Sequence, residues 1–374
     1  MKNEKLLYIH IPFCDSKCNY CAFNSYTNIN HLKKEYFNAL KKEFSQYNDL
    51  NFYTLFIGGG TPSTMNIEFY EKLFKLIEKN IKNAKEITIE CNPNTSYEWL
   101  KEIRNFGINR ISFGVQSFNE NKLKFLNRNH SSFQAIKSIE NAKKAGFDNI
   151  NLDLIYSTKV DTKELLENDL KIAFSLPVTH ISAYSLTIEE NTKWEGDFEK
   201  RKENEELEIY FINKIKEKFD QYEISNFGKK CLHNLGYWEG REYIGIGSGA
   251  VGFLQMDNKK WKKNQLHHYT NIPLTNNQYT TPQLVRYYTQ NDVYKYLKNP
   301  CKYKYEILSN EDIKKEKIFL GLRSIVGFDE AILNKNEKEK VEILIKEKKL
   351  SKKNKRIYSK DFLLADAITS YLIN

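Results

Sequence analysis

Three cysteines lie within eight residues near the start of the chain, at Cys14, Cys18 and Cys21. Their spacing, C-x3-C-x2-C, brings three thiolates close enough together to bind one metal centre. Four thiolates would saturate a four-iron cube, whereas three leave one iron without a protein ligand. A catalytic metal site keeps such an open position for a substrate. The spacing therefore favours an iron–sulfur centre in which one iron is available to another molecule.

Two alternatives remain open for the cysteine triplet at this point. A zinc site would need a fourth ligand, which His10 or His31 could supply, and the grouping could also be accidental. The other three cysteines, Cys91, Cys231 and Cys301, are scattered and are expected to be packed thiols. Because no signal-peptide pattern precedes the triplet, we expect a cytoplasmic protein, whose thiols are normally reduced.

The chain of 374 residues carries a net charge of +10. A basic protein can bind nucleic acid or an anionic ligand. Its lysines are interleaved with glutamates almost everywhere, so most of this charge is expected on solvated faces. No apolar run reaches the 18 residues of a membrane-spanning helix. We therefore expect any association with a membrane to be transient and to depend on partner proteins.

Six short runs rich in β-branched and aromatic residues alternate with longer stretches of helical periodicity. The alternation is typical of βα units with a parallel sheet. The near-continuous apolar character of the runs predicts a sheet that is covered on both faces. We predict an α/β fold with a partial, TIM-like (β/α)6 barrel. The expected strands are 6–11, 54–59, 86–91, 110–115, 149–155 and 180–186, and the clearest expected helices are 31–47, 66–81, 132–145 and 161–174.

Polar or glycine-rich motifs follow the predicted strands. The cysteine triplet follows the first strand, GGGTPS the second, ECNP the third and GVQSF the fourth, and NLDLIY lies at the fifth. In barrels of this kind the active site lies at the carboxyl ends of the strands. We therefore expect these five motifs to converge on one rim.

The sequence pattern changes twice along the chain. We expect the barrel at residues 1–225, an extension rich in aromatic residues and glycine at 226–300, and a C-terminal module at 301–374. Within the extension, residues 258–280 are polar and Asn-rich, which predicts a loop. The module is expected to be a small helical, winged-helix-like unit. Its expected helices are 311–325, 336–350 and 361–373, with a short hairpin before the last.

The stretch YIHIPFC at residues 8–14, together with the two cysteines that follow, resembles the radical S-adenosylmethionine (SAM) superfamily. The ordered motifs GGGTPS, GVQSF, NLDLIY, YEISNF and HNLGYW extend the resemblance over nearly the whole chain, to the family of HemW haem chaperones, which are oxygen-independent coproporphyrinogen III oxidase-like proteins. The resemblance implies a [4Fe–4S] cluster and SAM, which chelates the fourth iron through its amino and carboxylate groups. Reductive cleavage of SAM would then give a 5′-deoxyadenosyl radical.

The resemblance also implies which residues surround the cofactors. Cys14, Cys18 and Cys21 would be the cluster ligands. The missing side chains of the GGGT loop would let the backbone approach SAM, and polar and aromatic side chains from neighbouring strand ends would complete the contacts. The residues implied at the SAM site are Tyr8, Tyr20, Gly59, Gly60, Thr61, Glu90, Gln116, Arg128 and Asp153.

Two features separate a haem carrier from an oxidase. By resemblance, the true oxidases decarboxylate two propionates to vinyl groups and carry a fourth cysteine two positions after the third, where this chain has Phe23. The motif HNLGYW supplies an imidazole in His233 and an aromatic wall in Tyr237 and Trp238, which suit haem iron and its macrocycle. Both features favour a haem chaperone over a coproporphyrinogen dehydrogenase.

Alternatives stay open around the implied haem site. His233 could equally be a core or capping histidine, and Cys231 is a competing ligand to the iron. Lys229 and Lys230 could meet the propionates of haem.

One stretch departs from the family pattern. Where the family continues NLDLIY with Gly-Leu-Pro, this chain has Ser157-Thr158-Lys159. The replacement changes the turn chemistry next to the fifth strand and puts the loop on the SAM side in doubt.

The implied partners are haem, haem-requiring proteins such as respiratory membrane enzymes, and a second copy of the chain in a homodimer. The first rival function is the oxidative decarboxylation of porphyrinogen propionates. The second is a tRNA-modifying radical SAM enzyme, suggested by the basic turn with Lys352, Lys353, Lys355 and Arg356. A wing facing solvent explains these cations better, so nucleic acid is not expected as a partner.

Overall fold

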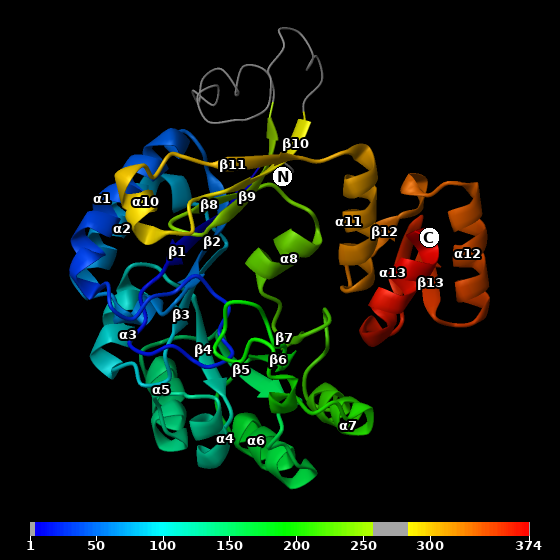
Figure 1. Ribbon diagram of the computed structural model, residues 1–374, viewed down its shortest axis with the longest axis horizontal. Helices are drawn as coiled ribbons and strands as arrows, with labels where there is room; N and C mark the ends of the chain where they lie inside the picture. The colour runs from blue at the N-terminus through cyan, green and yellow to red at the C-terminus, as the bar shows by residue number, and fades with distance from the viewer. Residues whose placement is uncertain (1–3, 257–282, 374) are drawn as a thin grey trace, which may run out of the picture.

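Six parallel strands, each next to its predecessor along the chain, form the curved sheet at the centre of the molecule (Figure 1). The computed structural model describes residues 4–256 and 283–373, so the predicted loop at 258–280 lies outside the described residues. All six strands coincide with runs expected from the sequence, which confirms the partial barrel. They are β1 (Lys5–Ile11), β2 (Phe52–Gly59), β3 (Glu86–Cys91), β4 (Arg110–Gln116), β5 (Ile150–Tyr156) and β6 (His180–Ser185).

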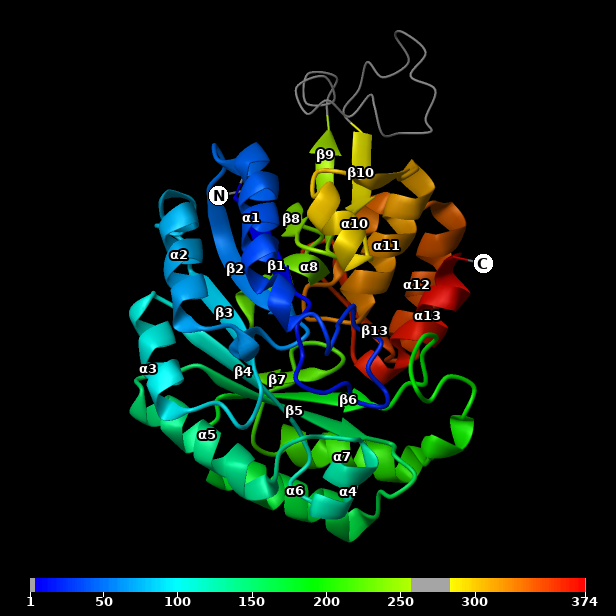
Figure 2. The same cartoon turned by 60° about the vertical axis from the view of Figure 1, so that its left-hand side comes forward.

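Helices connect these strands and cover the outer face of the sheet (Figure 2). In the second of them, Tyr70, Phe74 and Ile77 recur at helical spacing and are buried. The side chain of Asn66 caps its first turn by accepting the backbone N–H of Phe69. The helices are α1 (Lys33–Phe44), α2 (Ile67–Ile81), α3 (Tyr97–Asn105), the short α4 (Glu120–Phe125), α5 (Ser132–Lys144), α6 (Lys163–Ser175) and α7 (Glu205–Lys216).

The two faces of the six-stranded sheet differ in chemistry. In β4, Ile111 and Phe113 belong to the apolar core beneath the helices, whereas Arg110, Ser112 and Gln116 line a cavity on the other face. Successive side chains of a strand point to opposite faces. The inner face is also buried, but it borders a cavity and carries polar side chains such as Arg110 and Ser112 there.

Further strands extend the sheet at both edges. β7 pairs antiparallel with β6, and β8 pairs parallel with β1 and continues into an antiparallel ribbon. The last strand of this ribbon lies beyond residue 300, so one sheet crosses the expected boundary, and the division into three parts stays a proposal. The elements are β7 (Asn226–Gly228), α8 (Leu232–Trp238), β8 (Tyr243–Ile246), β9 (Val251–Met256), β10 (Gln283–Tyr288), α10 (Val293–Lys298) and β11 (Lys304–Ile307).

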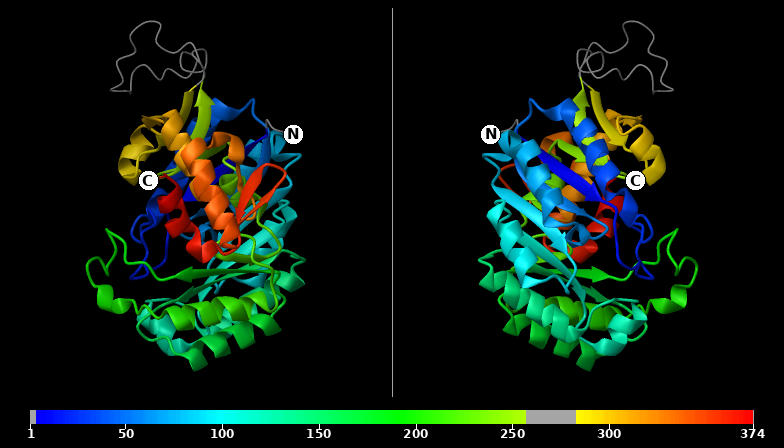
Figure 3. Two further views of the ribbon diagram at one scale, coloured as in Figure 1. Left: turned by 90° about the vertical axis from the view of Figure 1, so that its right-hand side faces the viewer. Right: turned by 90° about the vertical axis from the view of Figure 1, so that its left-hand side faces the viewer.

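The C-terminal module has an apolar core of its own, which includes Leu322, Phe328 and Ile357. It lies on the side of the molecule opposite α1 and α2, in front of the sheet in one view and behind it in the other (Figure 3). The expected order of helix, helix, hairpin and helix is confirmed. The elements are α11 (Asn310–Leu322), β12 (Phe328–Asp329), α12 (Lys335–Lys346), β13 (Leu350–Lys353), β14 (Arg356–Ser359) and α13 (Ala365–Ile373).

Within residues 4–256 and 283–373, no helix is both long enough and apolar enough to cross a membrane.

Candidate functional site

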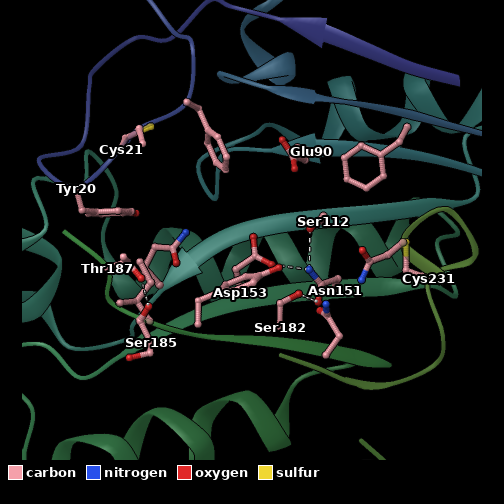
Figure 4. Close-up of a pocket in the computed structure, with 18 of the residues that line it drawn as sticks. Tyr20, Cys21, Glu90, Ser112, Asn151, Asp153, Ser182, Ser185, Thr187 and Cys231 are labelled. Atoms are coloured by element: carbon pink, nitrogen blue, oxygen red, sulfur yellow. Dashed lines mark hydrogen bonds between the residues drawn. The ribbon is translucent and has the colours of Figure 1, made fainter. Parts of the chain in front are cut away.

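Two adjoining cavities lie on the inner face of the sheet. The smaller, about 130 Å³, is at the carboxyl ends of the strands. The larger, about 540 Å³, extends from this rim down to the first residues of the strands and to α8. Figure 4 shows side chains from neighbouring strands projecting into the space, with Tyr20 and Cys21 on a loop opposite. Residues that line both cavities are Tyr20, Cys21, Phe23, Glu90, Ser112, Gln116 and Asp153.

The loop after β1 brings Cys14, Cys18 and Cys21 to the smaller cavity. Cys14 Sγ lies 3.4 Å from Thr61 Oγ1, and Arg128 Nη1 donates to Cys18 Sγ at 3.1 Å. Burial raises the pKa values of the Cys14 and Cys21 thiols, which favours their neutral form until a metal replaces the protons. Three thiols facing one cavity beside a guanidinium suit an anionic metal–thiolate centre.

Glycines at the end of β2 and directly after it line the smaller cavity as well. Gly59 has φ +115°, and a Cβ there would lie 2.4 Å from His10 Cε1. A Cβ on Gly60 would come within 3.0 Å of Cys14 Sγ. Glycine is needed at these positions because any side chain would clash with its neighbours. Without side chains, the backbone amides here can approach a ligand closely.

Two carboxylates face each other where the cavities meet. Glu90 Oε2 accepts the backbone N–H of Gly59 at 3.0 Å, and Asp153 Oδ1 accepts from Asn151 Nδ2 at 2.8 Å. Burial, and then the nearby Asp153, raise the pKa of Glu90 to about 7. Burial also raises the pKa of Asp153. Both carboxylates would be better accommodated beside a cationic ligand.

Two residues that line the smaller cavity carry buried polar atoms without partners. Gln116 is a non-glycine residue at φ +70°, a strained backbone conformation of the kind that clusters at functional sites. Among the described residues, Gln116 Oε1 and Arg128 Nε have no hydrogen-bond partner. Arg128 Nη2 donates to Gly114 O at 2.6 Å. The cavity thus offers an acceptor and a donor that a polar cofactor would satisfy.

Tyr8 is the one implied SAM residue that lies away from the cysteines, on the wall of the larger cavity. Its hydroxyl is 3.0 Å from His10 Nδ1, and His10 Nε2 is 2.8 Å from Asn24 O. Since a carbonyl only accepts, Nε2 carries the proton and Tyr8 donates to Nδ1. Burial lowers the pKa of His10 to about 4. Neither His10 nor His31 lines the cavity of the cysteines, so neither is placed as a fourth zinc ligand.

In the part of the chain that the structure describes, no three His, Cys, Asp or Glu side chains are grouped closely enough for a single metal ion. The three thiols surround a cavity instead of converging on one point.

The motif HNLGYW forms α8 at the far end of the larger cavity. His233 is 1% exposed, and both its ring nitrogens have partners: Nδ1 lies 2.7 Å from Thr54 Oγ1 and Nε2 lies 2.9 Å from Tyr237 Oη. Burial, with help from Arg110, lowers the pKa of His233 to about 3. His233 and Tyr237 line the cavity, whereas Trp238 is not among its lining residues. An iron ligand at Nε2 would have to displace the Tyr237 hydroxyl.

Glu86, at the start of β3, fixes the position of α8. Its Oε2 accepts the backbone N–H of Leu232 at 2.9 Å, and its Oε1 accepts the backbone N–H of His233 at 3.0 Å and the thiol of Cys231 at 3.3 Å. Cys231 is 3% exposed, and burial raises the pKa of its thiol to about 12. Lys229 and Lys230 are exposed and are not among the residues lining the cavity.

Several residues of the larger cavity were not singled out from the sequence. They share one property, since each occupies an inward position of a strand and has at least one apolar outward neighbour. Reading each strand with a period of two would have found them. They include Phe56, Arg110, Ser112, Asn151, Ser182 and Tyr184.

The departure at Ser157-Thr158-Lys159 leaves both cavities intact, because none of the three residues lines either one. Ser157 keeps φ +62°, a left-handed conformation that glycine adopts more easily. Its Oγ donates to Glu208 Oε1 at 2.6 Å, and the Thr158 N–H donates to Asp161 Oδ2 at 2.8 Å. Side-chain hydrogen bonds therefore support the turn without glycine.

Comparisons with known proteins agree with this geometry. The model of the radical SAM superfamily matches residues 8–173. A protein named heme chaperone HemW from Lactococcus lactis subsp. lactis is 32% identical over 376 aligned positions, which cover 95% of this chain and 93% of the relative. Heme chaperone HemW of Bacillus subtilis is 38% identical over 269 positions, covering 67% of this chain and 71% of the relative.

A solved structure shares the whole fold. Coproporphyrinogen III oxidase (HemN) from Escherichia coli superposes with a TM-score of 0.76 over 100% of this chain and 91% of that one, at 20% identity. At this identity the similarity concerns the fold alone.

Proposed function

The chain belongs to the radical SAM superfamily and, within it, to the HemW-type haem chaperones, and we propose that it binds haem and delivers it to haem-requiring proteins. The observation that carries the proposal is the pair of adjoining cavities. One gathers three thiols beside a glycine loop, and the other is large enough for a flat ligand at about 540 Å³.

The smaller cavity would hold the cofactors. Cys14, Cys18 and Cys21 would bind a [4Fe–4S] cluster, and the cluster, when bound, supplies the electron for reductive cleavage of SAM. Gly59, Gly60 and Thr61 would let SAM lie against the backbone. The further residues proposed to contact SAM are Tyr8, Tyr20, Glu90, Gln116, Arg128 and Asp153.

The larger cavity would hold haem as cargo. Phe56 and Tyr237 contribute aromatic surface to its wall, which suits a macrocycle. His233 would become the axial ligand only when Tyr237 moves away. Trp238 lies outside this wall, so its proposed role in binding haem would be indirect.

Iron and sulfide reconstitution under anaerobic conditions tests the cofactor part. Cys14→Ala, Cys18→Ala and Cys21→Ala should each lose the charge-transfer absorption and the bound iron. Cys301→Ala, the control, replaces a free cysteine outside the triplet that lines neither cavity, and should keep both. Full iron content in all three triplet variants would overturn the proposed ligands.

Two further assays separate carriage from oxidation. Haem titration should give a saturable shift of the Soret band, and bound haem should transfer to an apo-haem protein with a respiratory-type site. Incubation of the reconstituted protein with SAM, a reductant and coproporphyrinogen III should yield no protoporphyrinogen IX. Multiple turnovers to that product would replace the chaperone proposal with the decarboxylase, and would show that Phe23 does not prevent the reaction.

The proposed partners are haem and haem-requiring proteins such as respiratory membrane enzymes, with a homodimer as the assembly that the cluster and SAM would control. Sedimentation of the protein with and without reconstituted cluster tests the dimer. An unchanged sedimentation coefficient would contradict it.

A further inference from the structure

Arg110, the first residue of β4, is a buried cation without a hydrogen-bonded counter-ion. It is 3% exposed, and its Nε has no partner among the described residues. None of the ion pairs found within residues 4–256 and 283–373 involves it. Burying a charge costs free energy unless hydrogen bonds and an opposite charge compensate for it. A guanidinium kept in this state on the wall of a cavity is suited to receive an anion from outside.

The carboxylates near Arg110 are occupied by other donors. Glu86 has both oxygens engaged by the first residues of α8, and Asp153 accepts from Asn151. Burial opposes the charged form of Arg110, but the surrounding acidic groups Cys231, Glu86, Tyr222 and Asp153 raise its pKa on balance. The neighbours therefore keep the guanidinium protonated without supplying the paired oxygens that its planar fork can bind.

The charged residues of the larger cavity lie at different heights along the strands. The acidic residues Glu90 and Asp153 lie where it meets the smaller cavity, and Glu189 also lines it. Arg110 is the one lysine or arginine among the described lining residues; it lies at the amino end of β4, beside Cys231 and His233, and still interacts through space with Glu90 and Asp153. A ligand that fits this pattern carries its anionic group inward, away from the cationic cofactor proposed at the rim.

We propose that Arg110 binds a carboxylate of the cargo, so that haem enters the larger cavity with a propionate directed toward the start of β4. The inference rests on the proposed function and adds the orientation of the ligand. It assigns the propionate to a buried arginine in the barrel and not to the exposed Lys229 and Lys230. A guanidinium and a carboxylate can form two parallel hydrogen bonds, which makes Arg110 a determinant of specificity for carboxylate-bearing porphyrins.

A cycle of two ligands and two proteins tests the proposal. Haemin and haemin dimethyl ester, in which both propionates are esterified, are titrated by Soret absorption into wild-type protein and Arg110→Met. We expect the wild type to prefer haemin over the ester by about tenfold or more. Arg110→Met should bind both ligands with the affinity that the wild type shows for the ester.

The matched control is the double variant Lys229→Ala/Lys230→Ala, which removes two exposed cations outside the cavity. It should keep the wild-type preference for haemin. Loss of the preference in this variant, or its full retention in Arg110→Met, would overturn the proposal while leaving haem carriage intact. Absence of a Soret shift with either ligand in the wild type would overturn the proposed function itself, and the orientation with it.

A second variant keeps the test decisive if Arg110→Met does not fold. Ser112 follows Arg110 on the same inward face of β4, is 6% exposed and lines both cavities. Ser112→Asp would place an internal carboxylate near Arg110 that competes with the ligand's. It should weaken binding of haemin more than binding of the ester. Equal weakening of both ligands would show that the substitution blocks the cavity, and would count against the charge-specific role.

Discussion

His233 has the right side chain to ligate haem iron, but its hydrogen bonds in this structure leave neither ring nitrogen available. Its imidazole is neutral, which iron ligation requires. Both ring nitrogens are nevertheless hydrogen-bonded to hydroxyl groups, Nδ1 to that of Thr54 and Nε2 to that of Tyr237. Haem binding through this residue therefore costs one hydrogen bond inside the protein, and the Tyr237 hydroxyl competes with iron for Nε2.

Removing that hydroxyl should increase the affinity for haem. In Tyr237→Phe the aromatic ring stays and His233 Nε2 loses its partner, so we expect about fivefold tighter binding of haem, from a hydrogen bond worth roughly 1 kcal/mol. Soret titration measures the change. Iron-free protoporphyrin IX is the control ligand and should bind both proteins equally. Unchanged haem affinity, with the spectrum of the wild type, would show that His233 is not the axial ligand.

Glu90 should make stability depend on pH in the protein without cofactors. Burial raises its pKa from 4.5 to about 7 in the folded state, so the folded protein holds this proton more tightly than the unfolded chain. The associated stabilisation is complete below about pH 4.5 and is lost as the pH rises through 7. Glu90→Gln stays neutral and keeps an acceptor for the Gly59 N–H. It should exceed the wild type in stability at pH 8 by up to about 3 kcal/mol.

Urea denaturation at pH 5 and pH 8 checks this expectation, because the difference between the two proteins should shrink toward pH 5. Glu102→Gln, at an exposed position on α3, serves as the control. A stability difference that is the same at both pH values would contradict a raised pKa for Glu90.

Among the elements, the end of β2 shows most clearly that close packing of a neighbouring side chain requires a glycine. Gly59 lies against the ring of His10, which is itself fixed by Tyr8 and Asn24. The chain from Tyr8 through His10 to Gly59 therefore couples the wall of the larger cavity to the loop beside the cysteines. The residue type at 59 is decided by a neighbour 49 positions earlier in the sequence.

Gly59→Ala should destabilise the protein more than a glycine substitution with backbone strain alone. Gly107→Ala is the control variant, because Gly107 has φ +90° and no atom lies within 4 Å of an added Cβ. Both variants carry the strain of a positive φ. Only Gly59→Ala also forces the added Cβ against His10, so it should cost about 1–3 kcal/mol more.

Thermal denaturation of the two variants measures the difference, and calorimetric titration with SAM adds a second readout. Gly107→Ala should bind SAM as the wild type does, whereas Gly59→Ala should not. Equal losses of stability in the two variants would show that His10 yields easily and that the coupling is absent.

In the whole molecule, the C-terminal module is joined to the barrel next to the larger cavity. The Ile224 N–H donates to Arg323 O at 2.9 Å, and the Ile325 N–H donates to Tyr222 O at 3.0 Å. Tyr222 in turn contacts His180 Nε2 at 2.7 Å and accepts the N–H of Cys231. Docking of the module thus supports the segment from which α8 and the end of the cavity are built.

Breaking this backbone pairing should loosen the end of the cavity. Ile325→Pro removes the N–H that Tyr222 accepts and should destabilise the protein by about 1–3 kcal/mol. Hydrogen–deuterium exchange should increase in residues 222–238. Ile325→Ala keeps the N–H, and the side chain it shortens is 38% exposed, so this control should leave exchange unchanged. Faster exchange confined to the module would contradict the coupling.

The sequence determined the parts of this protein that depend on local pattern and on strand order. The alternation of strands and helices determined the partial barrel, because parallel strands need helical crossovers. Parallel order also places the carboxyl ends of the strands together, which brought the triplet, Gly60, Glu90 and Gln116 to one rim. The family resemblance added names and roles to positions that the pattern had already grouped.

Tertiary structure alone decided how these side chains are engaged. The sequence cannot show that Glu86 accepts hydrogen bonds from α8 and leaves Arg110 unpaired, because Glu86 and α8 are distant along the chain. Nor can it show that the Tyr237 hydroxyl is hydrogen-bonded to His233 Nε2. Whether a buried charge is paired depends on which donors reach the same carboxylate in space. The sequence determines which chemical groups are present at each position. The tertiary structure determines which of these groups remain free to bind a ligand.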